Sequence, residues 1–228
     1  MNPRPVIFDL DGVLVDSEPL YERAFRAYLD SCGQSEDAAL FSVTLGRRRM
    51  DFLGELAAHL GHDEGDLARG LDAAEAGFER LVEPMPGGAD AVVALRADGR
   101  PLALATSSGA EFAARILLRL GIREHFDAVI TGEEVERGKP DPAIYRLAAG
   151  RLGVAAESCI AIEDTPVGVA SAKAAGMSCV AVPHGLSEAA GLGQADVIAD
   201  DLSAAVGAAR RLDDGQGLGA GSLSRPCG

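Results

Sequence analysis

The chain has 228 residues, 47% of them apolar and 25% charged, and its formal net charge is −14. These proportions are ordinary for a globular protein that can bury a substantial core. The acidic balance argues against nucleic acid or an anionic membrane as a partner, because both are bound by basic faces.

No apolar run in the sequence approaches the roughly 20 residues needed to cross a bilayer. The apolar run near the N-terminus is short and is interrupted by Asp9. We therefore expect no membrane span, no signal peptide and a cytoplasmic location. The four cysteines show no CxxC or metal-ligand spacing, so we expect reduced thiols.

The first predicted strand, Val6–Phe8, leads directly into Asp9 and Asp11 in the stretch VIFDLDG. Aspartate is depleted in strands, and side chains at i and i+2 project to the same face, where two carboxylates repel each other. A tight turn at Asp11-Gly12 is one alternative, but it leaves Asp9 unexplained. A cation held between the two carboxylates explains both.

Residues 17–84 contain no convincing strand. Their apolar residues recur at helical spacing, which predicts amphipathic helices. A small helical domain inserted over residues 17–84 is therefore predicted, with the turn at residues 84–88 as the return hinge. The two apolar stripes are Tyr21, Phe25, Tyr28, Leu29 and Cys32, and Phe52, Leu53, Leu56 and Leu60.

After residue 85, short apolar strands alternate with helices, which predicts an α/β fold with a parallel sheet covered on both faces. Residues 1–16 and 85–212 would form this core, and the glycine-rich stretch 213–228 is predicted to be disordered. The expected strands are 101–105, 128–130, 159–162, 179–182 and 197–199. Helix signals are a capping box at Ser108 and Glu111, starts at Asp141-Pro142 and Thr165-Pro166, and terminal glycines at 121, 153 and 176.

Polar residues follow several of these strands, at the sheet edge where open parallel sheets bind ligands. Each has an ordinary explanation alone: Thr106 as a helix entry, Lys139 as a surface lysine, and Glu163-Asp164 as favourable charges at a helix start. Together, the carboxylates that follow these strands, a lysine and a hydroxyl indicate a site for a magnesium ion and a phosphate group.

The ordered set Asp9-Leu-Asp11-Gly12-Val13, Thr106, Lys139 and Glu163-Asp164 resembles the four motifs of the haloacid dehalogenase-like superfamily of phosphotransferases. The likeness extends over about residues 5–205 and is to the branch with a small helical cap after the first motif. It implies a Rossmann-like parallel sheet core with an inserted α-helical cap domain.

The resemblance also implies roles for the carboxylates. Asp9 would be the nucleophile that forms an aspartyl-phosphate, and Asp11 the general acid and then the base that activates water. The cofactor would be Mg2+, held by the Asp9 carboxylate, the Asp11 backbone carbonyl and Asp164. Glu163 would contribute directly or through water.

The remaining motif residues would bind the transferring phosphoryl group. By the resemblance, Thr106 and Lys139 contact it and the backbone N–H of Ser107 assists. In the cap, the stretch LGRRRM at residues 45–50 is either a solvated basic turn or a substrate contact. In β-phosphoglucomutase-like members, an arginine at the place of Arg49 binds the second anionic group of the substrate.

The expected function is a Mg2+-dependent phosphatase acting on a small phosphorylated metabolite such as a sugar or polyol phosphate, as a monomer or weak dimer. A sugar phosphomutase is the alternative. Mutases of this type carry a cap histidine where this chain has Tyr21, and a Lys-Asn pair where it has Gly109-Ala110. Two further alternatives are less favoured. 2-Haloacid dehalogenation shares the aspartate nucleophile but needs no metal, so Asp11 and Asp164 argue against it. A non-catalytic binding protein is disfavoured because no motif residue is missing.

Overall fold

The computed structural model describes residues 3–34, 38–42, 44–185 and 189–213. Its centre is a six-stranded sheet in the order β5-β4-β1-β6-β7-β8, in which every neighbouring pair is parallel. The predicted parallel α/β sheet is therefore confirmed. The strands are β1 (Val6–Phe8), β4 (Leu102–Thr106), β5 (Ala128–Thr131), β6 (Ile160–Glu163), β7 (Ser178–Ala181) and β8 (Val197–Ile198).

The register of the sheet determines where the polar residues lie. In β1, Phe8 is paired with Leu104 of β4 on one side and with Ile162 of β6 on the other. Asp9 therefore follows the central strand at the same edge where β4 ends at Thr106 and β6 ends at Glu163. The carboxyl ends of three adjacent strands meet there, as expected for an open parallel sheet that binds a ligand.

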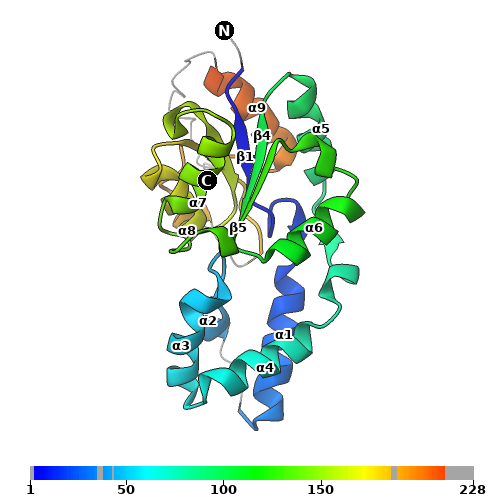
Figure 1. Ribbon diagram of the computed structural model, residues 1–228, viewed down its shortest axis with the longest axis vertical. Helices are drawn as coiled ribbons and strands as arrows, with labels where there is room; N and C mark the ends of the chain where they lie inside the picture. The colour runs from blue at the N-terminus through cyan, green and yellow to red at the C-terminus, as the bar shows by residue number, and fades with distance from the viewer. Residues whose placement is uncertain (1–2, 35–37, 43, 186–188, 214–228) are drawn as a thin grey trace, which may run out of the picture.

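Helices cover both faces of the sheet (Figure 1). Alternate strand residues face opposite sides, so Phe8 packs with the cluster containing Leu95 and Ile116, while Ile7 packs with Ile144 and Val169. The first face carries α5 (Gly88–Ala97), α6 (Ala110–Arg119) and α9 (Leu202–Asp213), and the second carries α7 (Ala143–Arg151) and α8 (Pro166–Ala174). Short 3-10 turns are η2 (Arg123–His125), η3 (Gly132–Glu134), η4 (Ala156–Ser158) and η5 (Ala189–Leu192).

A group of helices, called the cap below, lies beyond the carboxyl edge of the sheet and has its own apolar cluster (Figure 1). Phe25, Tyr28 and Leu29 of the predicted stripe are buried in it, but Cys32 is exposed. The stripe stops at Leu29 because the first helix ends at Ser31. The cap contains α1 (Glu18–Ser31), α2 (Ala38–Ser42), α3 (Arg49–Leu60), α4 (Glu64–Glu75) and η1 (Phe78–Arg80).

Two short antiparallel strands join the cap to the core, β2 (Val15–Asp16) and β3 (Glu83–Pro84), with Val15 paired to Pro84. Both chain crossings therefore run side by side. The sequence predicted a turn beginning at Pro84 and did not predict this pair, which is only two residues long. The division of the chain into residues 17–84 and the rest stays a prediction.

Several predicted helix ends are confirmed. Thr165 caps α8 by accepting a hydrogen bond from Gly168 N at 3.2 Å. The predicted start at Asp141-Pro142 is one residue too early: Pro142 is the N-cap residue of α7, and Asp141 accepts a hydrogen bond from Ala143 N at 2.9 Å. The glycines at 121, 153 and 176 follow α6, α7 and α8 with positive φ. The predicted capping box at Ser108 is wrong, because Gly109 precedes α6 and Ser108 Oγ instead donates to Asp11.

The prediction that Asp213 belongs to the glycine-rich tail is wrong. Asp213 is the last residue of α9, and its carboxylate accepts hydrogen bonds from Arg4 N and from Arg100. Residues 214–228 lie outside the described part of the chain, as does Cys227. The cysteines at 32, 159 and 179 are free thiols. No helix of the described residues is long and apolar enough to cross a membrane.

Candidate active site

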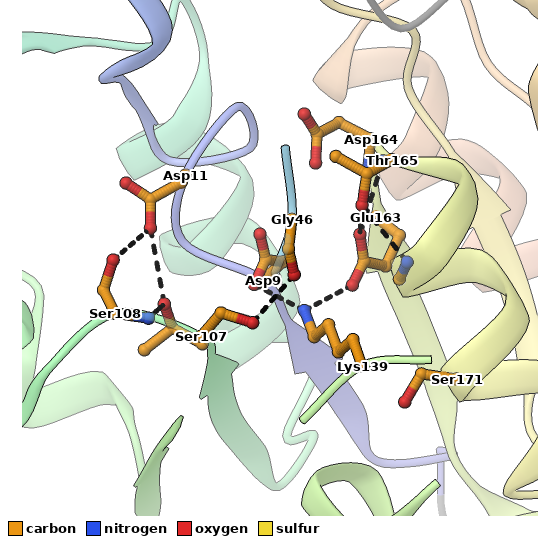
Figure 2. Close-up of polar contacts among 12 residues, drawn as sticks. Asp9, Asp11, Gly46, Ser107, Ser108, Lys139, Glu163, Asp164, Thr165 and Ser171 are labelled. Atoms are coloured by element: carbon orange, nitrogen blue, oxygen red, sulfur yellow. Dashed lines mark hydrogen bonds and ion pairs between the residues drawn. The ribbon is translucent and has the colours of Figure 1, made fainter. Parts of the chain in front are cut away.

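A buried ammonium group connects two of the motif carboxylates (Figure 2). Lys139 Nζ donates hydrogen bonds to Asp9 Oδ1 at 2.7 Å and to Glu163 Oε1 at 2.5 Å. The lysine is only 2% exposed, so the surface-lysine explanation is wrong. Glu163 Oε1 also accepts a hydrogen bond from the buried Tyr145 hydroxyl at 2.6 Å. The sequence did not single out Tyr145, because it lies on the apolar face of α7 like a core residue.

Burial and the close packing of carboxyl groups shift the pKa values of the residues at this edge of the sheet. The pKa of the Asp9 carboxyl is raised to about 7, mainly by burial and against the effect of Lys139. Burial and the charges of Glu163 and Asp9 raise the pKa of Asp164 well above its ordinary value. Burial lowers the pKa of Lys139, but Asp9 and Glu163 raise it by more. Carboxylates packed this closely favour a cation among them.

Oxygen atoms of Asp9, Glu163 and Asp164 lie within 4.8 Å of one another and could hold a metal ion. Asp164 Oδ1 is buried and has no hydrogen-bond partner in the described structure. Gly12 makes room for this carboxylate: its φ is +76°, and a Cβ there would lie 1.9 Å from Asp164 Oδ2. Three hard oxygen donors, one of them unpaired, fit a Mg2+ ion.

Asp11 lies apart from this group and is surrounded by hydroxyls (Figure 2). Its carboxylate accepts hydrogen bonds from Ser17 Oγ at 2.5 Å, Ser108 Oγ at 2.6 Å and Thr106 Oγ1 at 3.4 Å. These contacts fix the orientation of the carboxyl group. The sequence assigned Ser108 to a helix cap and gave Ser17 no role, because a serine near a helix start has an ordinary structural use.

The cap contacts the core close to these residues. Ser107 Oγ, beside the backbone N–H that is predicted to bind phosphate, donates to the carbonyl oxygen of Gly46 at 2.8 Å. Arg48, only 4% exposed, donates to the carbonyl oxygens of Gly132 and Val135 in the segment leading to Lys139, at 2.9 and 2.7 Å. The sequence pointed to Arg49 in the arginine run and not to Arg48, since nothing in the run distinguishes its members.

Arg48 makes further hydrogen bonds, to Asp51 within the cap and to Glu136 in the core. Its guanidinium forms two parallel hydrogen bonds of 2.6 Å with the carboxylate of Asp51, and donates a further one to the carbonyl oxygen of Glu136 at 3.0 Å. Forked pairing of this kind fixes the guanidinium plane. The arginine therefore holds the cap against the loop that precedes Lys139.

Between the sheet edge and the cap lies a cavity of about 350 Å3. Asp9, Asp11 and Asp164 line its core end, and Arg49 and Glu75 line its cap end. The Arg49 guanidinium donates hydrogen bonds to the carboxylates of Asp72 and Glu75. Burial raises the pKa of Glu75, while Arg49 lowers it.

Tyr21 also lines the cavity. Its ring lies edge-on to Phe78 with the ring centres 5.8 Å apart. Burial and the charges of Asp11 and Glu75 raise the pKa of its phenol above the ordinary value. It is therefore a neutral hydroxyl in the cavity wall near neutral pH.

A family model described as haloacid dehalogenase-like hydrolase matches residues 4–176. The chain belongs to this family. The matched residues include β1, the cap and every motif position named above, so the family and the fold expected from the motifs are both confirmed. The individual roles of Asp9, Asp11, Thr106, Ser107 and Lys139 stay predictions.

Relatives and solved structures of this hydrolase family agree with the assignment. The chain is 35% identical over 198 residues to the phosphorylated carbohydrates phosphatase of Thermotoga maritima, covering 85% of this chain and 92% of the relative. It is 33% identical over 180 residues to the fructose-1-phosphate phosphatase YqaB of Escherichia coli, covering 78% and 95%. The crystal structure of a putative β-phosphoglucomutase from Thermotoga maritima matches with a TM-score of 0.71 at 31% identity, covering 92% of this chain and 99% of that one.

Proposed function

We propose that this chain is a Mg2+-dependent phosphatase that hydrolyses a small phosphorylated carbohydrate through an aspartyl-phosphate on Asp9. The observation that carries the proposal is the buried contact of Lys139 with Asp9 and Glu163, where Asp9 lines the core end of the cavity. The names of the two relatives, a phosphorylated carbohydrates phosphatase and a fructose-1-phosphate phosphatase, support the substrate class.

In the first step, an Asp9 carboxylate oxygen attacks phosphorus and the bond to the leaving oxygen breaks. Asp11, oriented by its hydroxyl partners, protonates that oxygen and releases the alcohol. Lys139 offsets the charge of Asp9 and of the incoming phosphate, so that the two anions can approach. Thr106 and the Ser107 N–H bind the equatorial phosphoryl oxygens.

In the second step, Asp11 takes a proton from a water molecule, which attacks phosphorus. The Asp9–phosphate bond breaks, and Asp9 returns as a carboxylate. Asp9, Asp164, the Asp11 carbonyl and Glu163 would hold the Mg2+, which when bound supplies positive charge beside the transferring phosphoryl group. Closure of the cap through Gly46 and Arg48 keeps bulk water out of the cavity during the first step.

Sugar phosphomutase activity is the second candidate, because a putative β-phosphoglucomutase is among the similar structures. A mutase must keep its aspartyl-phosphate from water until the bisphosphate intermediate has turned round. Tyr21, a neutral phenol with a raised pKa, does not perform the proton chemistry of a histidine near neutral pH. We therefore expect hydrolysis to dominate.

The test supplies β-glucose 1-phosphate with a trace of the 1,6-bisphosphate and follows glucose 6-phosphate and free phosphate together. We expect free phosphate with little glucose 6-phosphate, and none of either from the Asp9→Asn variant. Rapid formation of glucose 6-phosphate with negligible phosphate release would replace the phosphatase proposal with the mutase.

A further inference from the structure

The charged groups around the cavity are mostly acidic. Among the described residues that line it, five are carboxylates and two are arginines. Both arginines already bind carboxylates: Arg47 contacts Glu55 Oε2 at 3.4 Å, and Arg49 contacts Asp72 and Glu75. The five carboxylates are Asp9, Asp11, Glu18, Glu75 and Asp164.

Glu75 is the acidic group at the cap end of this cavity. Its side chain at the end of α4 is 19% exposed, whereas that of Asp72, the other partner of Arg49, is 71% exposed. Only Glu75 of these two lines the cavity. At the cavity wall the positive charge of Arg49 is therefore balanced by Glu75. Asp72 binds the same guanidinium from the solvent side.

Much of the rest of the cap wall is apolar. Aromatic and aliphatic side chains of the cap line the cavity beside the ion pair, and these surfaces suit the C–H faces of a compact molecule better than a second hydrated anion. They are Phe25, Phe41, Phe52, Leu56 and Leu71 of the cap's apolar cluster, together with Phe78.

We propose that Glu75 determines specificity: it accepts hydrogen bonds from hydroxyl groups of an uncharged leaving group and excludes substrates with a second anionic group. This inference rests on the proposed phosphatase function and narrows its substrate class to monophosphates of neutral sugars or polyols. A carboxylate only accepts hydrogen bonds, which hydroxyls can donate and a phosphate dianion cannot. A second phosphate group at the cap end of the cavity would be repelled by the negative charge of Glu75. Arg49 would offer it little attraction, because its positive charge is already paired with Glu75.

Fructose 1-phosphate and fructose 1,6-bisphosphate form a matched pair for the test, because they differ only in the distal phosphate. We expect wild-type kcat/KM to favour the monophosphate by about 10–100-fold, the size of one charged interaction. Equal values, or a preference for the bisphosphate, would overturn the specificity inference. Hydrolysis of p-nitrophenyl phosphate that depends on Asp9 tests the phosphatase function separately, since this probe has neither hydroxyls nor a second anion.

The Glu75→Gln variant isolates the carboxylate, and Asp72→Asn is its matched control. Each change removes one of the two negatively charged partners of Arg49, but Asp72 does not line the cavity. We expect Glu75→Gln to reduce the monophosphate preference about tenfold or more while Asp72→Asn changes it less than threefold. The same shift in both variants would show that the charge near Arg49, and not the place of Glu75, sets the preference.

Discussion

Replacing Lys139 by methionine tests the arrangement of buried charges at the sheet edge. Methionine keeps an unbranched side chain but removes the ammonium group that contacts Asp9 at 2.7 Å and Glu163 at 2.5 Å. The side chains of Lys139, Asp9 and Glu163 are 1%, 7% and 0% exposed, so water cannot take the place of the lost cation. The variant leaves buried carboxylates without their counter-ion.

Removing one partner of a buried ion pair costs about 3–5 kcal/mol of unfolding free energy. For a protein of 150–250 residues, each 1 kcal/mol lowers Tm by about 2–4 °C. We therefore expect Tm of Lys139→Met to fall by about 6–20 °C in a buffer with EDTA. Added Mg2+ should restore part of the loss, because a cation among the same carboxylates offsets their repulsion.

The chain offers a matched control, since its one other lysine is Lys173. Lys173 pairs with Asp196 at 2.6 Å, and the two side chains are 30% and 37% exposed. Pairs of this kind contribute about 0–1 kcal/mol. Thermal unfolding followed by circular dichroism should show a fall of at most a few degrees for Lys173→Met. Equal falls in the two variants would refute the claim that Lys139 compensates buried charge.

Other predictions concern the metal, the cap contact and the proton relay. EDTA should abolish hydrolysis of p-nitrophenyl phosphate and Mg2+ should restore it, whereas Ca2+ should inhibit because it favours longer bonds and looser geometry; full activity in chelator would contradict the metal assignment. Arg48→Ala should lower kcat/KM for fructose 1-phosphate about 10–100-fold through loss of its carbonyl contacts. The exposed cap arginine Arg69 gives the control, and an Arg69→Ala variant that loses as much would remove the special role of Arg48. Asp11→Asn should slow both chemical steps with fructose 1-phosphate by about 100-fold or more, and normal single-turnover release of fructose by this variant would exclude Asp11 as the acid.

The sequence predicted the sheet well because strands buried on both faces appear in the sequence as short continuous apolar runs. The continuous apolar runs correspond to β4, β5, β6, β7 and β8 within one or two residues. The convergence of Asp9, Thr106 and Glu163 then followed from the rule that ligands bind at the carboxyl edge. The two-residue pair β2–β3 carries no periodic signal and was missed.

The contacts of the site were less predictable because they depend on tertiary placement. Ser108 has the spacing of a helix cap, and only the fold shows that its hydroxyl is used by Asp11. Arg48 and Arg49 are adjacent in one basic run, yet one binds the core and the other faces the cavity. Glu75 lies at the end of α4, far from any motif, and only cap folding brings it to the cavity that faces the sheet edge.

The nucleophilic role of Asp9 is the central claim, and the turnover of Asp9→Asn with p-nitrophenyl phosphate and Mg2+ tests it most directly. The substitution is isosteric, and a circular dichroism spectrum matching wild type establishes that the variant is folded. With the attacking carboxylate gone, we expect kcat to fall by about a thousandfold or more. Turnover within tenfold of wild type would contradict an aspartyl-phosphate on Asp9.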